Sequence, residues 1–387
     1  LIHNATIINE GQSVQGSVVM KNGRIAEVLT NWKPLSAPCE EVIDATGCYL
    51  LPGIIDDHVH FRDPGLTHKA DILTESRAAA AGGVTSIMDM PNTNPLTVTL
   101  DALNAKLDLL NEKCIVNHSC YFGATNNNYT EFDKLDKHRV CGIKLFMGSS
   151  TGNMLVDKMN SLLNIFNGTD MLIAAHCEDQ ETIKNNIEKY KQKYKGADDI
   201  PVSAHPSIRS VPACYASSEL AVRLAKIAGA RLHILHVSTA KELQLFSDEP
   251  LANKNITAEA CVAHLLFTLT HYNSLGARIK CNPAVKRKTD REALRTAVNS
   301  GLIDVIATDH APHLLSEKEG GALKAMSGMP MIQFSLVSML ELVDEGVFSL
   351  ETVVQKMCHA PARIYGICQR GYIREGYQAD LVLVRPN

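Results

Sequence analysis

The stretch that decides the fold is residues 49–65, which read YLLPGIIDDHVHFRDPG. Its apolar first half is typical of a buried strand in a parallel sheet. Alternate side chains of a strand share one face, so His58 and His60 are expected to point the same way. Two imidazoles on one face at the end of a strand can bind a single metal ion. Taken alone, the motif also fits two surface histidines.

Seven further apolar runs of strand length follow, and segments of helical length separate many of them. With the first run, the eight predicted strands are 53–56, 84–88, 115–118, 142–146, 171–175, 232–235, 256–259 and 303–307. The predicted helices are 74–81, 102–111, 179–193, 217–229 and 290–299. Eight β-then-α units predict an α/β fold, a (β/α)8 TIM-like barrel, whose chemistry lies at the carboxyl ends of its strands.

The two ends of the chain predict a second, small β domain. Short alternating runs at 5–8, 17–20 and 24–28 are broken by Gly and Asn, and similar runs return at 371–373 and 380–384. Neither set is large enough to bury a core alone. We therefore predict that residues 1–49 and 369–387 form one β-sandwich domain beside a barrel of residues 50–368. Because the sequence starts at Leu1 and stops soon after Val384, we expect further residues beyond its ends.

Composition argues against several classes of function. The 387 residues are 45% hydrophobic and 21% charged, and their net charge of −4 without a basic block argues against nucleic acid as the main partner. No apolar run is long enough to span a membrane, and no secretory signal pattern is present. Eleven cysteines, an odd number without a Cys-x-x-Cys pair, favour a reducing cytoplasm over a disulfide framework.

Four of the later predicted strands carry or precede one residue each that can bind a metal: Lys144, His176, His236 and Asp309. A lysine in an apolar strand is costly unless it is neutral, paired or modified. If CO2 carboxylates it, the resulting anionic carbamate can bridge two metals. The alternatives are a lysine that extends to the strand edge and histidines that are hydrogen-bonded in the core. An aspartate at the mouth of a barrel can both bind metal and accept a proton.

With His58 and His60, these residues make six candidate ligands, each at a predicted strand end. A nitrogen and oxygen donor set without thiolates suits zinc, with manganese or cobalt also tolerated. Two such cations that share a hydroxide would generate a nucleophile at neutral pH and polarise a carbonyl. The set therefore predicts hydrolysis, or its reversal, at an amide-like carbon.

The chain resembles the amidohydrolase superfamily, and within it the dihydroorotases, over nearly its whole length. The motifs that carry this resemblance are LPGIID (51–56), HVHFRDPG (58–65), MPNT (90–93), GIKLF (142–146), HVST (236–239), NP (282–283), TDHAPH (308–313) and GYQAD (376–380). The resemblance implies a cytoplasmic hydrolase that acts on cyclic amide C–N bonds. Its reaction would be the reversible cyclisation of carbamoyl aspartate to dihydroorotate in pyrimidine biosynthesis, with a homodimer expected by analogy.

The resemblance also implies roles for individual residues. Two zinc ions would be bridged by carboxylated Lys144 and a hydroxide, and Asp309 would take a proton and pass it to the departing ring nitrogen. Carbamoyl aspartate and dihydroorotate each carry a carboxylate that does not react. Arg62, two residues beyond His60, is expected on the same strand face and would hold that carboxylate with a forked pair of hydrogen bonds. The remaining residues expected to bind substrate are Asn92, Asn282 and His313.

Other readings remain open at this point. Arg62 could instead form a surface ion pair with Asp63 or Asp71, and the two asparagines could be turn residues. Hydantoinases, dihydropyrimidinases and allantoinases share the metal scaffold, but their substrates lack the ring carboxylate. Outside enzymes, the alternative is a scaffold protein on a non-catalytic barrel. The glycine-rich segment 319–330 is expected to form a loop over the mouth of the barrel.

Overall fold

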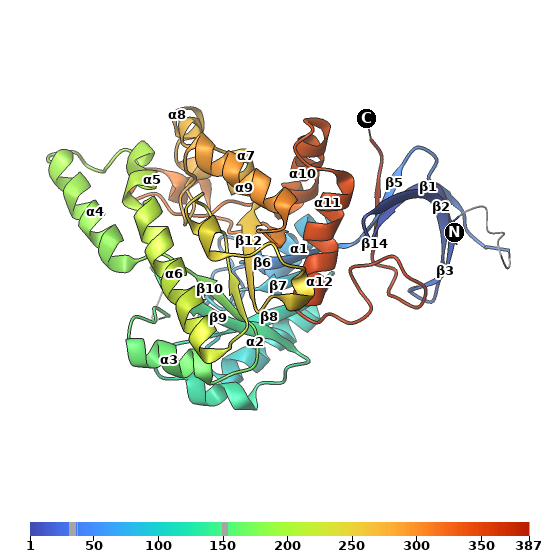
Figure 1. The fold of residues 1–387 in the computed structure, drawn as a ribbon, viewed down its shortest axis with the longest axis horizontal. Coiled ribbons are helices and arrows are strands. Elements are labelled where there is room, and N and C mark those ends of the chain that lie inside the picture. Colours follow the sequence, from blue (N-terminus) through green and yellow to red (C-terminus); the bar gives the residue numbers. More distant parts are fainter. Residues whose placement is uncertain (31–35, 37, 149–153, 387) are drawn as a thin grey trace.

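Eight parallel strands surrounded by helices form the larger part of the protein (Figure 1). The computed structural model describes residues 1–30, 36, 38–148 and 154–386. In sheet order, the strands are β6 (Ile54–Val59), β7 (Val84–Asp89), β8 (Asn117–Gly123), β9 (Val140–Phe146), β10 (Ile173–His176), β11 (Leu232–Ile234), β12 (Ile256–Cys261) and β13 (Val305–Ala307). Each overlaps one predicted strand, so the predicted barrel is confirmed.

The first strand and the segment after the last one close the barrel. Val59 forms a parallel bridge with His310, and the His60 amide donates to the His310 carbonyl at 2.7 Å. The carboxyl ends of all eight strands therefore surround one opening, where the chemistry of such barrels is found.

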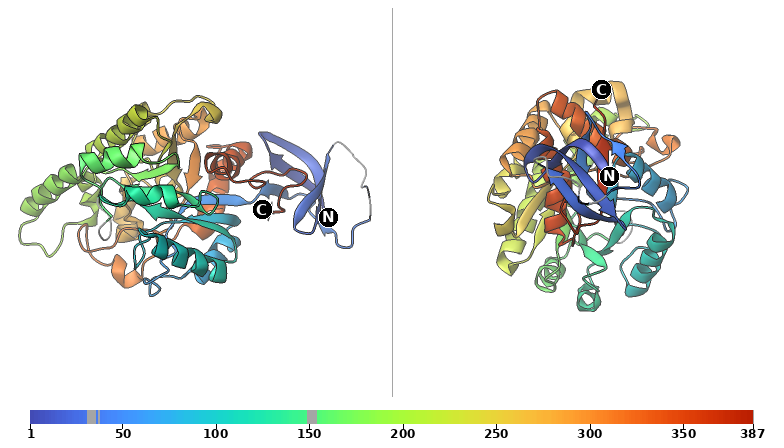
Figure 2. Two further views of the ribbon diagram at one scale, coloured as in Figure 1. Left: turned by 90° about the horizontal axis from the view of Figure 1, so that it is seen from below. Right: turned by 90° about the vertical axis from the view of Figure 1, so that its right-hand side faces the viewer.

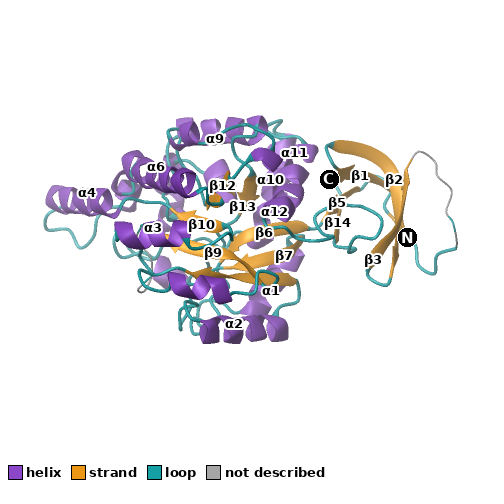
Figure 3. Cartoon of the chain, turned by 60° about the horizontal axis from the view of Figure 1, so that its bottom comes forward, coloured by secondary structure: helices purple, strands orange, loops and turns teal. Residues whose placement is uncertain are grey.

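Helices cover the outside of the barrel (Figure 3). They are α1 (Ile72–Ala81), α2 (Leu100–Lys113), α3 (Met159–Asn167), α4 (Gln180–Lys193), α5 (His205–Ile208), α6 (Val211–Ala228), α7 (Val262–Leu266), α8 (Tyr272–Leu275), α9 (Lys288–Ser300), α10 (Ser335–Asp344), α11 (Leu350–Val354) and α12 (Ala360–Ile364). Shorter helical turns are η1 (Tyr129–Lys134), η2 (Val202–Ala204), η3 (Glu242–Leu245), η4 (Leu251–Asn253), η5 (Leu269–His271), η6 (Gly276–Ile279), η7 (Leu315–Lys318), η8 (Ile332–Phe334) and the π-helical η9 (Gln355–His359). Among the described helices, none is both long and apolar enough to cross a lipid bilayer.

All five predicted helices are present, as α1, α2, α4, α6 and α9, whereas α3 and α10 were not predicted. Local start signals account for two of the predicted helices. Asp71 accepts a hydrogen bond from the Thr74 amide at the start of α1, and Thr99 does the same for Ala102 at the start of α2. Neither α3 nor α10 begins with a capping side chain, so their sequences carry no such signal.

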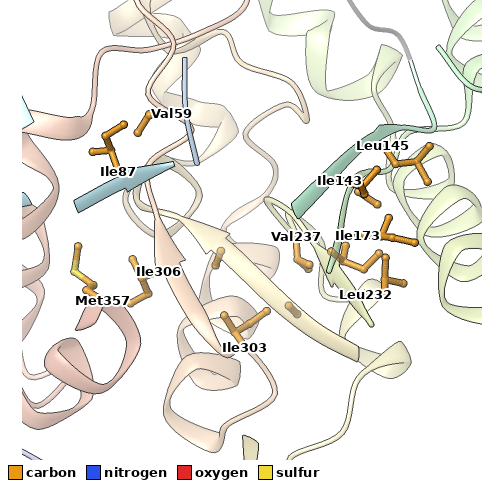
Figure 4. Close-up of a cluster of buried hydrophobic side chains, with 14 of the residues drawn as sticks. Val59, Ile87, Ile143, Leu145, Ile173, Leu232, Val237, Ile303, Ile306 and Met357 are labelled. Carbon is orange, nitrogen blue, oxygen red and sulfur yellow. The ribbon is translucent and has the colours of Figure 1, made fainter. Parts of the chain in front are cut away.

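Strand alternation separates the main core from the barrel interior. In β9, Ile143 and Leu145 join the large apolar cluster that also holds Ile173, Leu232 and Ile306 (Figure 4). Lys144, between them in sequence, lines the cavity at the mouth of the barrel. Burying each large aliphatic side chain contributes about 1.5–3 kcal/mol, so the register that exposes Lys144 to the cavity is strongly fixed.

The two chain ends pair in a separate six-stranded sheet, which lies beside the barrel (Figure 2). Its strands are β1 (Ile2–Asn9), β2 (Gln12–Lys21), β3 (Arg24–Thr30), β4 (Ile43–Asp44), β5 (Tyr49–Pro52) and β14 (Leu381–Val384). β14 runs antiparallel to β5, so the predicted pairing of the two ends is confirmed. The predicted run at 371–373 is not a strand, although Ile373 packs in the small core.

The apolar run at 49–55, which we predicted as one strand, divides at Gly53 into β5 and β6. A Cβ atom at Gly53 would lie 2.0 Å from the Thr85 hydroxyl oxygen, so only glycine allows this close approach. Residues 50–52 thus pair with the small sheet, although we predicted the barrel domain from residue 50. The domain limits stay a prediction, and Asn387, the last residue of the predicted small domain, lies outside the described residues.

Candidate active site and metal centre

All the predicted site residues line one cavity of about 640 Å³ at the carboxyl ends of the barrel strands. The six predicted ligands are there: His58, His60, Lys144, His176, His236 and Asp309. The four predicted substrate-binding residues are also there: Arg62, Asn92, Asn282 and His313. The structure thus brings together residues from sequence positions 58 to 313, whose roles stay predictions.

One cluster of donor atoms joins the first and last barrel strands. The Nε2 atoms of His58 and His60 lie 3.2 and 3.1 Å from Asp309 Oδ1. Burial by itself would raise the pKa of Asp309, but the two histidines hold it well below its usual value, so the carboxylate is ionised. Donor atoms of these three residues lie within 4.8 Å of one another, which is the spacing that a single metal ion needs.

A second cluster lies beside the first. His176 Nδ1 and His236 Nε2 are 2.8 Å apart, and the His236 ring centroid lies 5.3 Å from that of His58. Lys144 is buried, and its amine lies 4.6 Å from the centre of the Phe146 ring. Burial lowers the pKa of Lys144 to about 8, and no described residue forms a hydrogen bond or ion pair with its amine. A buried amine in this position fits the predicted carbamate, whose negative charge would be held by cations.

The backbone at these strand ends is unusual. Arg62, His236 and Asp309 have φ angles of 67°, 39° and 49°, in the left-handed region that residues other than glycine seldom adopt. Such conformations persist only where the surroundings impose them, and they concentrate at functional sites. Three strained residues in one cavity therefore support a functional role for this end of the barrel.

Contacts to neighbouring oxygen atoms orient the rings of three histidines. Nδ1 of His58 lies 2.9 Å from Glu259 Oε1, and Nδ1 of His60 lies 2.7 Å from Asn92 Oδ1. Each contact needs a proton on Nδ1, so in the neutral ring the lone pair is on Nε2, which faces the cavity. His176 has the opposite arrangement, because its Nε2 lies 3.1 Å from a carboxylate oxygen of Glu178 and its Nδ1 faces His236.

Sequence reasoning missed Glu178 and Glu259. Arg209 forms an ion pair with Glu178, and both carboxylates are fully buried. The available signal was a charged residue within or directly after an apolar strand, the same signal that drew attention to Lys144. The sequence pattern predicts residue 259 only as the end of a strand.

At the other side of the cavity, Arg62 is held by the segment after β13. Its Nε donates to the Pro312 carbonyl at 3.1 Å, and one terminal nitrogen lies 3.1 Å from His313 Nε2. The alternative ion pairs are not formed, because Asp63 pairs with Lys113 and the Asp71 side chain accepts from the Thr74 amide. Our reason for placing Arg62 was wrong: β6 ends at Val59, and a left-handed turn rather than strand alternation turns the side chain into the cavity.

The two asparagines differ in their surroundings. Asn92 lines the cavity and also orients His60, as described above. Asn282 lines the cavity too, and its buried Oδ1 has no hydrogen-bond partner among the described residues. An unsatisfied buried amide oxygen is costly, so Asn282 is suited to accept a hydrogen bond from a bound molecule.

The predicted loop over the mouth is present. Leu323, Ala325 and Gly328 are among its residues that line the cavity. The Asp199 carboxylate fixes this loop from the side, because it accepts hydrogen bonds from the amides of Gly321, Leu323 and Lys324. The cavity is therefore walled by the loop as well as by the strand ends.

The charge and donor chemistry of the cavity fit divalent cations. Burial would lower the pKa of His58, yet the charges of Glu259 and Asp309 raise it to about 9. Negative charge in excess around His58 favours a bound cation. The donors are imidazole nitrogens and a carboxylate, a set that suits zinc and tolerates manganese or cobalt.

Comparison with known proteins agrees with this chemistry. The model of the family described as "Amidohydrolase family" matches residues 49–387. The chain belongs to the amidohydrolase family. The resemblance inferred from the sequence is therefore confirmed, and the eight barrel strands and their ligand-bearing ends all lie within the matched region.

Among the similar sequences are proteins named dihydroorotase. The one from Methanosphaera stadtmanae is 31% identical over 375 residues, which cover 95% of this chain and 83% of the relative. The one from Aquifex aeolicus is 33% identical over 395 residues, which cover 100% of this chain and 89% of the relative.

The similar solved structures include hydantoinases. The L-hydantoinase (dihydropyrimidinase) from Arthrobacter aurescens has a TM-score of 0.91 at 28% sequence identity. The match covers 98% of this chain and 85% of the hydantoinase chain. The dihydropyrimidinase from Brevibacillus agri has a TM-score of 0.88 at 24% sequence identity, and the match covers 100% of this chain and 86% of the dihydropyrimidinase chain. At this identity, the likeness shows the fold alone.

Proposed function

We propose that this chain is a dihydroorotase, which catalyses the reversible conversion of dihydroorotate and water to carbamoyl aspartate. The observation that carries this proposal is one cavity that holds two kinds of group. A cluster of donor atoms suited to divalent cations lies at one side, and a buried arginine lies at the other. The similarity to proteins named dihydroorotase supports the same substrate.

We further propose that His58, His60, His176, His236, Asp309 and carboxylated Lys144 would hold two zinc ions. Divalent cations held there would supply a nucleophile from water at neutral pH and polarise the reacting carbonyl. The carbamate would form when the neutral Lys144 amine attacks CO2 and releases one proton. The Lys144 side chain would then carry a negative charge, which a lysine otherwise lacks.

Asp309 is the residue that we propose to move protons. Its carboxylate is ionised and lies within hydrogen-bond distance of His58 and His60. In ring opening, it accepts a proton from the attacking water and delivers it to the ring nitrogen as the C–N bond breaks. In ring closure, the carbamoyl nitrogen attacks the side-chain carboxyl group and loses its proton to Asp309, which passes that proton to the departing hydroxyl group so that water leaves.

Arg62 would set the substrate class. Arg62 is 7% exposed and lines the same cavity as the proposed ligands. A forked pair of charge-assisted hydrogen bonds to the unreactive carboxylate would orient the ring, with Asn92, Asn282 and His313 as further contacts. Burying an arginine that meets no anion would be costly, which favours a substrate with a carboxylate.

A hydantoinase activity is the alternative that the solved structures raise, because the same fold at TM-score 0.91 occurs in an L-hydantoinase. The test is the rate of ring opening for dihydroorotate, hydantoin, dihydrouracil and allantoin, measured side by side on protein of known metal content. We expect kcat/KM for dihydroorotate to exceed the others by at least about 100-fold, the discrimination that a buried polar contact can give. A preference for an uncharged ring would refute the dihydroorotase proposal and favour a hydantoinase or allantoinase, and no turnover of any ring would favour a scaffold.

A further inference from the structure

Glu259 is a buried carboxylate beneath the cavity to which neither the metal nor the substrate proposal gives a role. It lies on β12, the seventh barrel strand, between two alanines, and its side chain has no exposed surface. Its Oε1 atom lies 2.9 Å from His58 Nδ1 and also accepts a hydrogen bond from the His236 backbone amide at 2.9 Å. One oxygen atom thus contacts two proposed ligands from different parts of the chain, His58 on β6 and His236 in the segment after β11.

Each contact fixes a feature that a metal site needs. The bond to Nδ1 of His58 leaves Nε2 to face the cavity, where it lies 3.2 Å from Asp309. The bond to the His236 amide holds a residue whose φ angle is 39°. That backbone conformation places His236 Nε2 at 2.8 Å from His176 Nδ1. The same carboxylate therefore positions one residue of each donor cluster.

The second oxygen of Glu259 lies near His233. Oε2 lies 3.8 Å from Nε2 of His233, and that nitrogen is 3.3 Å from an oxygen of Asp57. The other nitrogen of His233 is bonded to the Thr257 hydroxyl at 2.7 Å. All four residues are buried, so this support lies out of reach of substrate and solvent and acts on the cavity only through the ligands.

We propose that Glu259 is a positioning residue that aligns His58 and His236 for metal binding and thereby couples the two halves of the centre. This inference rests on the proposed function, because it needs a metal at these histidines. Metal-ligating histidines commonly donate their second N–H to a carboxylate, and loss of such a partner typically weakens metal binding by about 10- to 100-fold. Here one carboxylate serves two ligands, so both metal positions should respond to its loss.

The test compares Glu259→Gln with a matched variant, Glu242→Gln. Glu242 is also buried in the barrel, but it accepts hydrogen bonds from Ser218 and Thr239 and contacts none of the proposed ligands. For the wild type and both variants, zinc affinity is measured by competition with a chelator, and the visible spectrum of cobalt-loaded protein is recorded. The Tm of each metal-free protein reports loss of stability separately from loss of metal.

We expect Glu259→Gln to bind zinc about 10- to 100-fold more weakly and to change the cobalt spectrum, while Glu242→Gln keeps wild-type affinity. If Glu259→Gln does not fold, Glu259→Asp keeps the charge but withdraws the oxygen by one methylene, and the same loss is expected. Wild-type zinc affinity in the folded Glu259 variants, or an equal loss in Glu242→Gln, would overturn this proposal alone. Wild-type protein that takes up no metal would overturn the proposed metal centre as well.

Discussion

Two hollows of similar volume differ in how their charges are balanced. The cavity at the carboxyl ends of the strands measures about 640 Å³, and a hollow between the barrel and the small sheet measures about 700 Å³. In the second hollow, Arg374 pairs with Glu10 and Arg370 pairs with Asp380. Both ring nitrogens of His359 are also bonded there, to the Gly371 carbonyl and the Glu10 amide.

The cavity at the strand ends has the opposite character. Imidazole nitrogens face one another, Lys144 forms no ion pair with any described carboxylate, although the charges of Asp309 and Glu259 act on its amine, and Arg62 meets a carbonyl and a histidine. Size therefore does not distinguish the two hollows, whereas the cluster of metal-binding donor atoms and a buried lysine without an ion pair occur in the cavity at the strand ends. Buried ionisable side chains without an ion-pair partner are costly, and they concentrate at sites where a bound ligand supplies the missing partner.

The largest effect is expected from Asp309→Asn, which keeps the shape of the side chain but removes the proposed proton acceptor. We expect kcat for dihydroorotate ring opening to fall by about 10²- to 10⁴-fold, the usual contribution of a general acid–base group. Steady-state kinetics on protein of measured metal content checks this. A variant that keeps more than a tenth of wild-type kcat would remove Asp309 from the mechanism.

A second prediction contrasts two buried lysines. Lys106 pairs with Asp89 at 2.8 Å, and neither side chain is exposed, whereas Lys144 lacks such a partner. Lys106→Met should destabilise the protein by about 3–5 kcal/mol, because it leaves a buried carboxylate unpaired, while the folded variant still binds metal. Lys144→Met should lose at least one metal per chain with little loss of stability.

Elemental analysis measures the metal content of both lysine variants, and denaturation measures their free energy of unfolding; together these two measurements test the prediction. The same metal content in both lysine variants would show that Lys144 does not contribute to a metal site.

Arg62→Met tests the proposed contact with the substrate carboxylate. It should raise KM for dihydroorotate by about 10- to 100-fold, the value of hydrogen bonds to a charged group, and leave metal content unchanged. Arg295→Met is the matched control, because Arg295 donates to the Leu265 carbonyl and does not line the cavity. Equal KM values for the two variants would end the case for carboxylate recognition by Arg62.

The smallest effect belongs to the second hollow. Glu10→Gln removes an exposed ion pair with Arg374 and should cost at most about 1 kcal/mol of stability, with no change in kcat. The hydrogen bond from Arg374 lowers the pKa of Glu10 in the folded state, so its contribution is present above the ordinary pKa of 4.5 and is lost as pH falls below it. Denaturation at pH 7 and pH 3 checks the sign: the difference between wild type and variant should shrink at pH 3, and a wider difference would contradict it.

The sequence predicted the barrel and the gathering of its site residues because both follow from regular rules. Apolar runs of period two predict strands, and the carboxyl ends of parallel strands meet at one opening, so residues such as His176 and Asp309 had to lie near each other. The family resemblance then gave each residue a role. These roles stay predictions, but the geometry places no candidate elsewhere.

What the sequence did not predict depends on close contacts between distant segments. The strand break at Gly53 follows from the close packing of the Thr85 side chain against the Gly53 backbone, and no local sequence pattern predicts this contact. Arg62 enters the cavity through a left-handed turn, although alternation suggested the same place for a different reason. The role proposed for Glu259 depends on two distant segments, at His58 and His236, that meet at one of its oxygens, a feature visible only in three dimensions.

The central claim is that the cavity at the carboxyl ends of the barrel strands holds a binuclear metal centre and that the protein opens the dihydroorotate ring there. The most direct measurement is the rate of dihydroorotate ring opening as metal-free protein is titrated with zinc and bound metal is counted on the same sample. We expect no turnover without metal and a rate that rises until about two ions are bound per chain, as a two-metal hydrolase requires. Full turnover by metal-free protein, or none at full occupancy, would contradict the account.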